Sequence, residues 1–331
     1  MTTLAQALKF VQGAVAKKDP LPVLTHFSIR NNRVKGYNGL VTLSSPIPLA
    51  LDCQPKAIPF VKAIQTCEDT VQLSLTATGR LTVKSGKFRA HVECSPEPFP
   101  DVEPSGEFCE IKSGLVAALK VIEPLIAEDA SRPWARSVLM KEGSLFATNN
   151  VAIVQYWIGH DLPGDMCISH AVVNELIRIK EDPVGIQYDH SSITFHYTED
   201  RWLKASLVVN GWPDFERVLN VETDQSYIPP EFFPALDTLV PFVNSERDVF
   251  FSAHGVTTSL EDQEGSAVTI SGWDTPIGWY DIDVLRMLAG LATSADFTRY
   301  PNPSIFTGMD GALRGAIAGK KDANYPPPTA E

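Results

Sequence analysis

One order of elements recurs three times along this chain of 331 residues, which restricts it to folds built from one unit used three times. An aromatic-Pro-Asp triplet occupies residues 99–101 and again residues 212–214, an offset of 113 residues that is close to one third of the chain. Each triplet follows about 25 residues in which apolar side chains alternate with polar ones between turn residues. That pattern predicts an antiparallel meander of three strands with one buried face.

Helices are expected ahead of both meanders, near 58–67 and 170–180, and a first helix with further strands ahead of those, near 2–18 and 112–126. The last third has the same order, with helices near 230–243 and 282–292. Its strands are expected near 248–252, 256–260, 267–271, 296–299, 304–307 and 312–318. We therefore predict an α+β chain of three similar domains, each with two helices packed on antiparallel sheets. The domains are expected at 1–106, 107–222 and 223–331, the last with a Pro-rich C-terminal tail.

Composition places the chain among ordinary globular proteins, with 44% apolar and 21% charged residues. No apolar run reaches 18 residues, and the first 18 residues lack the features of a secretory signal, so we expect a cytoplasmic protein without a membrane span. The five cysteines are an odd number without CxxC spacing, which favours reduced thiols over a disulfide or metal framework.

The charge distribution is more informative than the net charge of −12, which by itself argues against tight sequence-independent binding to DNA. Counted over 2–18, 58–67, 112–122, 170–180, 229–243 and 282–293, the six expected helices hold nine Lys and Arg against four Asp and Glu, so the rest of the chain carries −17. Helices that contact phosphates while the sheets face solvent need this segregation, although exposed helix faces also carry lysine merely for solvation. The helix near 230–243 has two acids and no base, which weakens the pattern. The predicted DNA-contacting residues are Lys9, Lys17, Lys18, Lys62, Lys112, Lys120, Arg178, Lys180 and Arg286.

Catalytic motifs are missing from the sequence: there is no GxSxG, HExxH or P-loop pattern. The best acid-base candidates are His160 with Asp161 and Asp189 with His190. Both pairs fall in expected turns or strand ends, and adjacent residues of a strand point to opposite faces. The seven histidines show no metal-ligand spacing. We therefore expect no catalytic residue, no metal and no cofactor.

Four segments resemble the beta subunit of bacterial DNA polymerase III, the β sliding clamp, in the order in which that family has them. They are KKDPLPVLTHFSIRNNRVKGYN (17–38), SGKFRAHVECSPEPFPDV (85–102), RSVLMKEGSLFATNNVAIVQYWI (136–158) and LVVNGWPDFERVLN (207–220). The resemblance implies the DNA clamp fold and a head-to-tail homodimer that closes a ring of six domains around duplex DNA. It also implies binding without regard to DNA sequence, an ATP-dependent clamp loader that opens the ring, and a replicative polymerase tethered by it.

The resemblance further implies two sets of contact residues. Lys18 falls where the family places a basic residue that contacts DNA. A pocket for short peptides of the polymerase and loader would use Thr148, Val151, Ala152, Ile153, Pro213, Arg217, Val218, Tyr280, Asp283 and Ile305. The sequence departs from the family at Asn150-Val151-Ala152, where Gly-His-Arg is usual, at Tyr280 and Asp283, and at its Pro-rich end. Such divergence suits a phage or plasmid clamp as well as a chromosomal one.

Two other readings remain open on the sequence. One is a non-catalytic phage structural or interaction protein built from repeated α+β modules. The other is a hydrolase that uses His160 and Asp161. Exposed basic helices on one side would favour the clamp, whereas a deep pocket with converging titratable groups would favour an enzyme.

Overall fold

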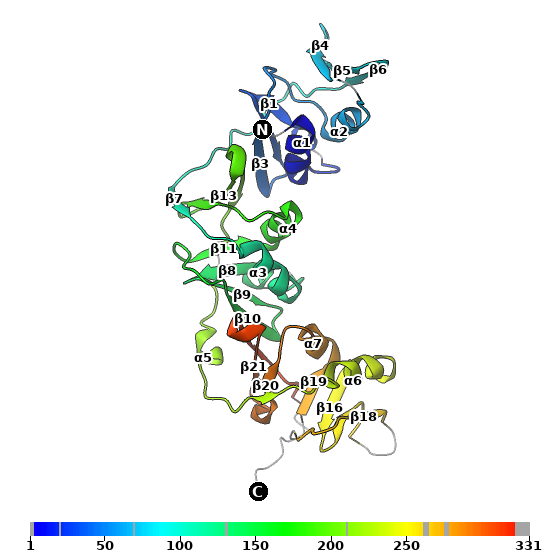
Figure 1. Ribbon diagram of the computed structural model, residues 1–331, viewed down its shortest axis with the longest axis vertical. Helices are drawn as coiled ribbons and strands as arrows, with labels where there is room; N and C mark the ends of the chain where they lie inside the picture. Colours follow the sequence, from blue (N-terminus) through cyan, green and yellow to red (C-terminus); the bar gives the residue numbers. More distant parts are fainter. Residues whose placement is uncertain are drawn as a thin grey trace. The chain divides into compact units, whose positions relative to one another are not determined.

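The computed structural model describes residues 3–19, 21–68, 70–129, 132–209, 211–260, 265–274 and 278–321. It divides into two compact units, the first made of residues 1–116 and 168–209, and the second of residues 117–167 and 210–331. Figure 1 shows helices and antiparallel strands alternating along the chain. The expected α+β class is confirmed.

Six helices lie near the expected positions but are shorter than predicted, and a further short helix, α5 (Glu216–Leu219), was not expected. They are α1 (Leu4–Val11), α2 (Ala57–Gln65), α3 (Leu115–Ile122), α4 (His170–Ile179), α5 (Glu216–Leu219), α6 (Phe232–Leu239) and α7 (Ile282–Met287). Three of them, α1, α3 and α6, continue into a short 3-10 turn. The helix near 2–18 thus ends at Val11, so Lys17 and Lys18 lie in the turn that follows it, and Lys112 precedes α3.

A seven-stranded sheet in unit 1 has the order β1-β2-β3-β14-β13-β12-β7. Its strands are β1 (Ser28–Arg30), β2 (Arg33–Tyr37), β3 (Val41–Pro46), β7 (Glu107–Glu110), β12 (Gly185–Tyr188), β13 (Ser192–Tyr197) and β14 (Arg201–Ser206). A smaller sheet of the same unit has the order β4-β5-β6, from β4 (Gln72–Leu75), β5 (Leu81–Ser85) and β6 (Phe88–Val92). Helix α1 lies close on β2, where a Cβ added to Gly36 would come within 2.7 Å of the Val11 carbonyl oxygen.

Unit 2 contains most of an eight-stranded sheet of order β11-β8-β9-β10-β22-β21-β20-β15. Its strands are β8 (Ser137–Lys141), β9 (Ser144–Thr148), β10 (Ala152–Trp157), β11 (Met166–Ser169), β15 (Ser226–Tyr227), β20 (Ser294–Asp296), β21 (Ser304–Gly308) and β22 (Leu313–Ile317). A four-stranded sheet has the order β18-β17-β16-β19, from β16 (Asp248–Ser252), β17 (Gly255–Thr257), β18 (Ala267–Thr269) and β19 (Gly278–Asp281).

The large sheets run across the expected domain boundaries. Strand β3 pairs with β14, so residues 41–46 join a sheet whose other half comes from residues 185–206. Strand β10 pairs with β22 in the same way. The order helix, strands, helix, three strands nevertheless occurs three times along the chain, with three strands after α1 and four after each of α3 and α6. The division at 1–106, 107–222 and 223–331 stays a prediction.

The cores form where the apolar alternation places them. In α3, Leu115, Leu119 and Ile122 are fully buried, as the spacing predicts, whereas Lys120 is exposed. A second core lies under α6 and α7, where Phe251 contacts Phe297 and Tyr280 at ring-centroid distances of 4.9 and 4.8 Å. The five cysteines are free thiols, as expected. In the part of the chain that the structure describes, no helix is both long and apolar enough to cross a bilayer.

Candidate nucleic-acid interface and partner-binding face

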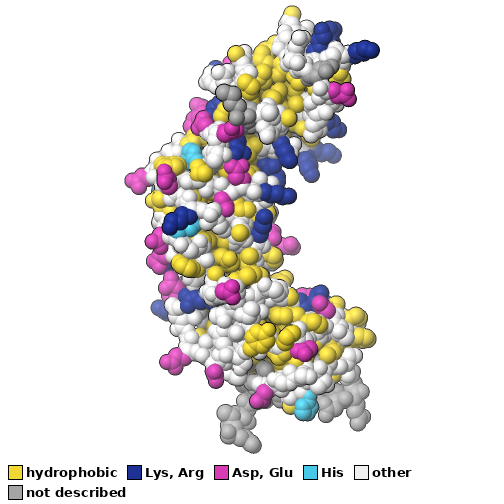
Figure 2. Space-filling view, viewed as in Figure 1, with side chains coloured by type: hydrophobic (Ala, Val, Ile, Leu, Met, Phe, Trp, Pro, Cys, Tyr) yellow, Lys and Arg dark blue, Asp and Glu magenta, His cyan; other side chains and the backbone are white. Residues whose placement is uncertain are grey.

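Seven of the nine predicted DNA-contacting residues are lysines with exposed side chains. Within the described ranges none of their ammonium groups forms an ion pair, so their charge is available to an outside anion. In unit 1, Figure 2 shows the dark blue side chains gathered mainly along the edge where α1, α2 and α4 lie in Figure 1, with magenta acids mostly along the other edge. The seven are Lys9, Lys17, Lys18, Lys62, Lys112, Lys120 and Lys180.

Arg178 is different, because its guanidinium is occupied within unit 1. Its Nε donates to Oε1 of Glu175 at 2.7 Å, and its two Nη groups donate to the carbonyl oxygens of Lys9 (3.2 Å) and Phe10 (2.6 Å). Those carbonyls belong to the last turn of α1, which lacks intrahelical donors. The Glu175 side chain is 9% exposed. Arg178 therefore joins α4 to the end of α1, and its guanidinium is already engaged by protein acceptors.

Arg286 is also neutralised, but at the surface of unit 2. Its Nε contacts Oδ1 of Asp237 at 2.7 Å, and its Nη1 lies 3.4 Å from Oδ1 of Asp283. Arg247 holds the same Asp283 through two bonds, Nε to Oδ2 at 2.7 Å and Nη2 to Oδ1 at 2.8 Å. The hydrogen bond from Arg247 lowers the pKa of Asp283, with Arg286 adding to the effect. Helices α6 and α7 therefore offer little free positive charge.

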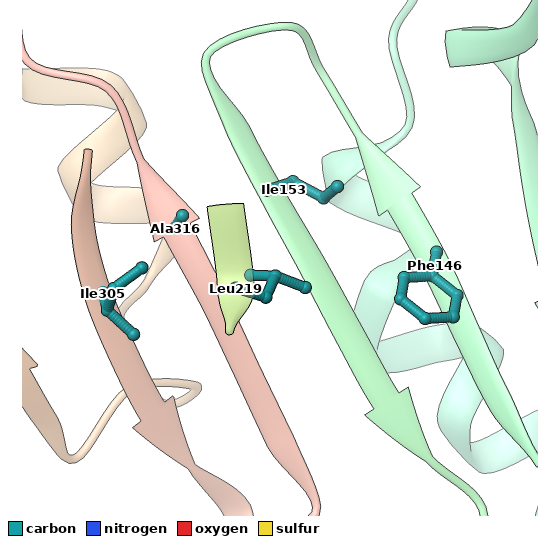
Figure 3. Close-up of a cluster of buried hydrophobic side chains, with 5 residues drawn as sticks. All are labelled: Phe146, Ile153, Leu219, Ile305 and Ala316. Atoms are coloured by element: carbon teal, nitrogen blue, oxygen red, sulfur yellow. The ribbon is translucent and has the colours of Figure 1, made fainter. Parts of the chain in front are cut away.

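One face of the eight-stranded sheet carries a row of small and apolar side chains, which we call the partner face. Ile153 pairs with Thr148 on β9 and Ala316 on β22, and Ala316 pairs with Ile305 on β21. Paired residues point to the same face, so these four line up across four strands. Figure 3 shows Leu219 of α5 beside Ile153 and Ile305, and Phe146 beyond.

The segment that covers the partner face is the one with the strongest resemblance to clamps. Val218, Trp212 and Phe215 pack partly buried against the apolar row. Trp212 also meets Trp134 at 5.7 Å between ring centroids and donates from Nε1 to Oγ of Ser137. Pro213 and Arg217 are exposed; the Arg217 side chain is 88% accessible and lies 3.2 Å from Asp214. The structure thus brings Thr148, Ile153, Val218 and Ile305 together, with Arg217 at the rim.

Three predicted pocket residues do not lie on this face. Ala152 precedes Ile153 on β10 and therefore points to the opposite face. Tyr280 is fully buried under α6 and α7, and its hydroxyl contacts Oγ of Ser304 at 2.7 Å. Since Ser304 precedes Ile305 on β21, Tyr280 packs behind the sheet rather than on the partner face. Asp283 is held by Arg247, as described above. Val151 is exposed in the hairpin between β9 and β10.

A row of polar side chains lies beside the apolar row, and it was not predicted from the sequence. Arg314 donates from Nε to Gln155 Oε1 at 2.6 Å and from Nη1 to Asn220 Oδ1 at 2.9 Å. Gln155 in turn donates to Oγ of Ser144 at 2.8 Å. This network ties the end of α5 to β9, β10 and β22, and so fixes the covering segment over the sheet.

The acid-base pairs show no catalytic arrangement. Asp189 closes the turn between β12 and β13: its carboxylate accepts from Ser105, Ser191 and Ser192, and these bonds, that from Ser105 foremost, lower its pKa. His190 lies exposed in that turn, and Asp161 is exposed next to the half-buried His160. Among the described residues, no group of three or more His, Cys, Asp or Glu is placed to hold a metal ion.

Comparison with known proteins identifies the fold. No family model and no curated protein matches the chain. Solved structures do match it. The β sliding clamp of C. crescentus superposes with a TM-score of 0.82 over 96% of this chain and 97% of its own, at 14% identity. This is the sliding-clamp fold. The DNA polymerase beta subunit of Streptococcus pyogenes (TM-score 0.80, 15% identity, 96% and 97%) and the DNA polymerase III beta subunit of Thermotoga maritima (0.79, 16%, 97% of each chain) agree.

The predicted resemblance and the predicted clamp fold are both confirmed by these superpositions. An identity of 14–16% is too low for the function to follow from the fold alone. The surfaces of this chain that bear on function are the lysines on and beside the helices and the partner face.

Proposed function

We propose that this chain is a sliding-clamp subunit: two copies close head to tail into a ring around duplex DNA, and the ring tethers a replicative polymerase in the cytoplasm without catalysis of its own. The observation that carries the proposal is the clamp fold over 96% of the chain. A ring holds DNA by enclosure, so it needs only weak phosphate contacts. This is compatible with a net charge of −12, which opposes tight surface binding.

Strand pairing supports closure by a second copy. We call β1–β3, β4–β6, β8–β10, β12–β14, β16–β18 and β20–β22 the three-strand sets. In two places the last strand of one set pairs with the last strand of another: β3 with β14, and β10 with β22. Two such last strands, β6 and β18, are left over. Among the described residues β6 pairs only with β5, and β18 only with β17. Unpaired edges are open to another chain, so β6 of one copy and β18 of the next would complete the series.

The segments that contain the two free edges differ in charge. Residues 78–92, which include β5 and β6, hold four bases and no acid: Arg80, Lys84, Lys87 and Arg89, all exposed. Residues 222–274, which include β18, hold ten acids and one base. Opposite charges steer association and suppress the wrong pairing of like edges. They favour β6 against β18 over β6 against β6, and therefore a head-to-tail ring.

The exposed lysines on and beside α1, α2, α3 and α4 supply the DNA contacts in this proposal. Ammonium groups without protein partners neutralise phosphates without reading bases, which permits sliding. Arg178 and Arg286 are left out, because both are already paired with acids. An ATP-dependent loader is required to open a closed ring.

The partner face would take a short peptide of the polymerase or the loader. An apolar anchor of the peptide would insert beside Val218, Ile153 and Ile305, while the exposed Arg217 would hold its polar groups. Val218→Asp, on a half-buried side chain, should abolish pull-down of a cognate polymerase. Glu222→Gln, at an exposed position just beyond, should leave it intact. Equal pull-down by both variants would remove the pocket from the proposal.

The test of enclosure is retention on DNA. The protein is loaded with a bacterial clamp loader and ATP onto a nicked circular plasmid and separated from free protein by gel filtration. Half of the sample is then cut once with a restriction enzyme. We expect the protein to stay on the circle and to leave the linear DNA. Equal retention on both would indicate ordinary surface binding, as the interaction-protein alternative predicts.

A matched pair of charge reversals tests the ring itself. Arg89→Glu on β6 should shift the mass in solution from twice 36.3 kDa toward 36.3 kDa and abolish retention on the circle. Arg136→Glu, an exposed base away from the free edges, should change neither. If Arg89→Glu stayed dimeric, closure through β6 would be wrong.

A further inference from the structure

A small hollow in unit 2 lies outside the lysine surface and the partner face. It measures about 180 Å³ and lies between the edge strand β15 and the turn after β18. Its buried floor includes the rings of Trp273 and Phe297, and its exposed rim includes Tyr227, Asp224 and Asp274. None of the described residues that line it is Lys, Arg or His. The hollow is thus aromatic inside and acidic outside.

Trp273, which lines the hollow, carries a buried hydrogen-bond donor without an acceptor among the described residues. Trp273 is 7% exposed, and its indole Nε1 has no partner among the described residues. Its ring is held by Phe232, stacked at 5.2 Å and 9°, and by Phe251, edge-on at 5.1 Å. Buried indole N–H groups normally find an acceptor. A ligand that brings a carbonyl oxygen to this floor would satisfy it.

The rim borders an open sheet edge. The Ile228 N–H donates to the Thr293 carbonyl, so the next pair along, Tyr227 with Ser294, is a non-hydrogen-bonded pair of the antiparallel ladder. The backbone N–H and C=O of Tyr227 therefore point away from β20, and no other described strand pairs with β15 on that side. An extended peptide can add itself to such an edge.

The charge around the hollow selects what the peptide must carry. Among the described residues that line the hollow, two are carboxylates, Asp224 and Asp274, and none is a base. Aromatic faces together with carboxylates attract Lys or Arg side chains. The last ten residues of the chain, 322–331, contain two acids and no base, so they do not complement this site.

We propose that the hollow and the open edge of β15 bind an extended basic segment of a partner protein. One Lys or Arg side chain enters between Trp273 and the rim carboxylates, and the backbone of the segment pairs with Tyr227. A carbonyl of the segment accepts from the Trp273 indole. The site does not depend on the proposed clamp function, since it uses neither the lysine surface nor the partner face.

The test uses a fluorescein-labelled heptapeptide with a single lysine in the middle of alternating threonine and valine, and the same peptide with norleucine in place of lysine. Anisotropy with the full-length protein should show saturable binding of the lysine peptide and at least about fivefold weaker binding of the norleucine peptide. Trp273→Phe keeps the stacked ring and removes the N–H, and Asp274→Asn removes one rim charge. Each should weaken binding by about threefold to tenfold.

Controls separate loss of the site from loss of the fold. Asp161→Asn, an exposed acid elsewhere in unit 2, should bind the lysine peptide as the parent does. Urea unfolding of each variant checks that it folds, and Asp274→Asn changes only an exposed side chain. The proposal is overturned if the parent binds no lysine peptide at 1 mM or binds the norleucine peptide equally well. It is also overturned if Asp274→Asn, folded like the parent, binds with unchanged affinity. Retention on circular DNA should be normal in the Trp273 variant, which keeps this result distinct from the clamp test.

Discussion

The helices α1 and α4 of unit 1 and the helices α6 and α7 of unit 2 both carry an arginine paired with an acid, yet the two pairs have different roles. Arg178 binds Glu175, whose side chain is 9% exposed, and caps the last carbonyls of α1. Arg286 binds Asp237, whose side chain is 62% exposed. In the first pair the arginine is structural and the nearby lysines carry free charge. In the second pair, the charge of Arg286 is neutralised by an acid that is itself exposed to solvent. A count of bases on helices cannot tell these cases apart, because the exposure of the partner acid decides between them.

The largest effect expected from this comparison is on stability. Arg178→Glu would place two carboxylates together in a half-buried site and release the end of α1. We expect the free energy of unfolding to fall by about 3 kcal/mol, the low end for breaking a buried pair, since the Arg178 side chain is one-third exposed. Urea unfolding followed by circular dichroism measures it. Lys180→Glu, the same reversal two residues on at an exposed position, should change stability by no more than about 0.5 kcal/mol. Equal losses would show that Arg178 is an ordinary surface base.

A second effect concerns DNA. The triple variant Lys9→Glu, Lys62→Glu, Lys120→Glu removes three unpaired charges without touching a core. If each lysine contacts a phosphate, the slope of log affinity against log salt should lose about 0.9 per contact, or about 2.7 in all. Arg286→Gln should leave the slope unchanged, because its charge is already neutralised by Asp237 and Asp283. Binding to nicked circular DNA between 50 and 200 mM KCl provides the measurement. An equal change of slope in both proteins would contradict the division between the two helix pairs.

Much of the fold is readable from the sequence, because it depends on local periodicity. The apolar residues Val172, Val173 and Leu176 were expected inward on α4 and are fully buried. Helix ends were less predictable. The helical spacing of Leu4, Leu8, Val11 and Val15 predicts a helix that reaches Val15, but α1 ends at Val11. The pairing of β3 with β14 has no local signal, since the two strands are about 160 residues apart.

The site was less predictable than the fold, for the same reason. No role was assigned to Glu175 from the sequence, and only the fold brings it to Arg178 and the end of α1. The resemblance groups Ile153, Val218 and Ile305, and the structure places them in one cluster, while their role in peptide binding stays a prediction. Tyr280 was misplaced, although the alternation of Ser304 and Ile305 on one strand separates it from that cluster. The unpaired indole of Trp273 leaves no trace in the sequence, because it depends on which acceptors are missing nearby.

The smallest effect tests the solvent-exposed member of the comparison through pH. Arg247 holds Asp283 by two hydrogen bonds, and the Asp283 side chain is 43% exposed, so Asp283→Asn should cost only about 0.5–1 kcal/mol at pH 7. The hydrogen bond from Arg247 lowers the folded-state pKa of Asp283 below the unfolded value of about 3.9. A lowered carboxyl pKa gives stability that is complete above the unfolded pKa and is lost as pH falls through the folded pKa. The gap in unfolding free energy between the parent and Asp283→Asn should therefore be constant from pH 7 to about 5 and close toward pH 3. Asp161→Asn, at an exposed acid for which the described structure shows no ion pair, serves as the control and should open no gap at pH 7. A gap that stayed constant down to pH 3 would mean that the carboxylate charge contributes nothing, and that the neutral hydrogen bonds of the side chain hold α7 to Arg247.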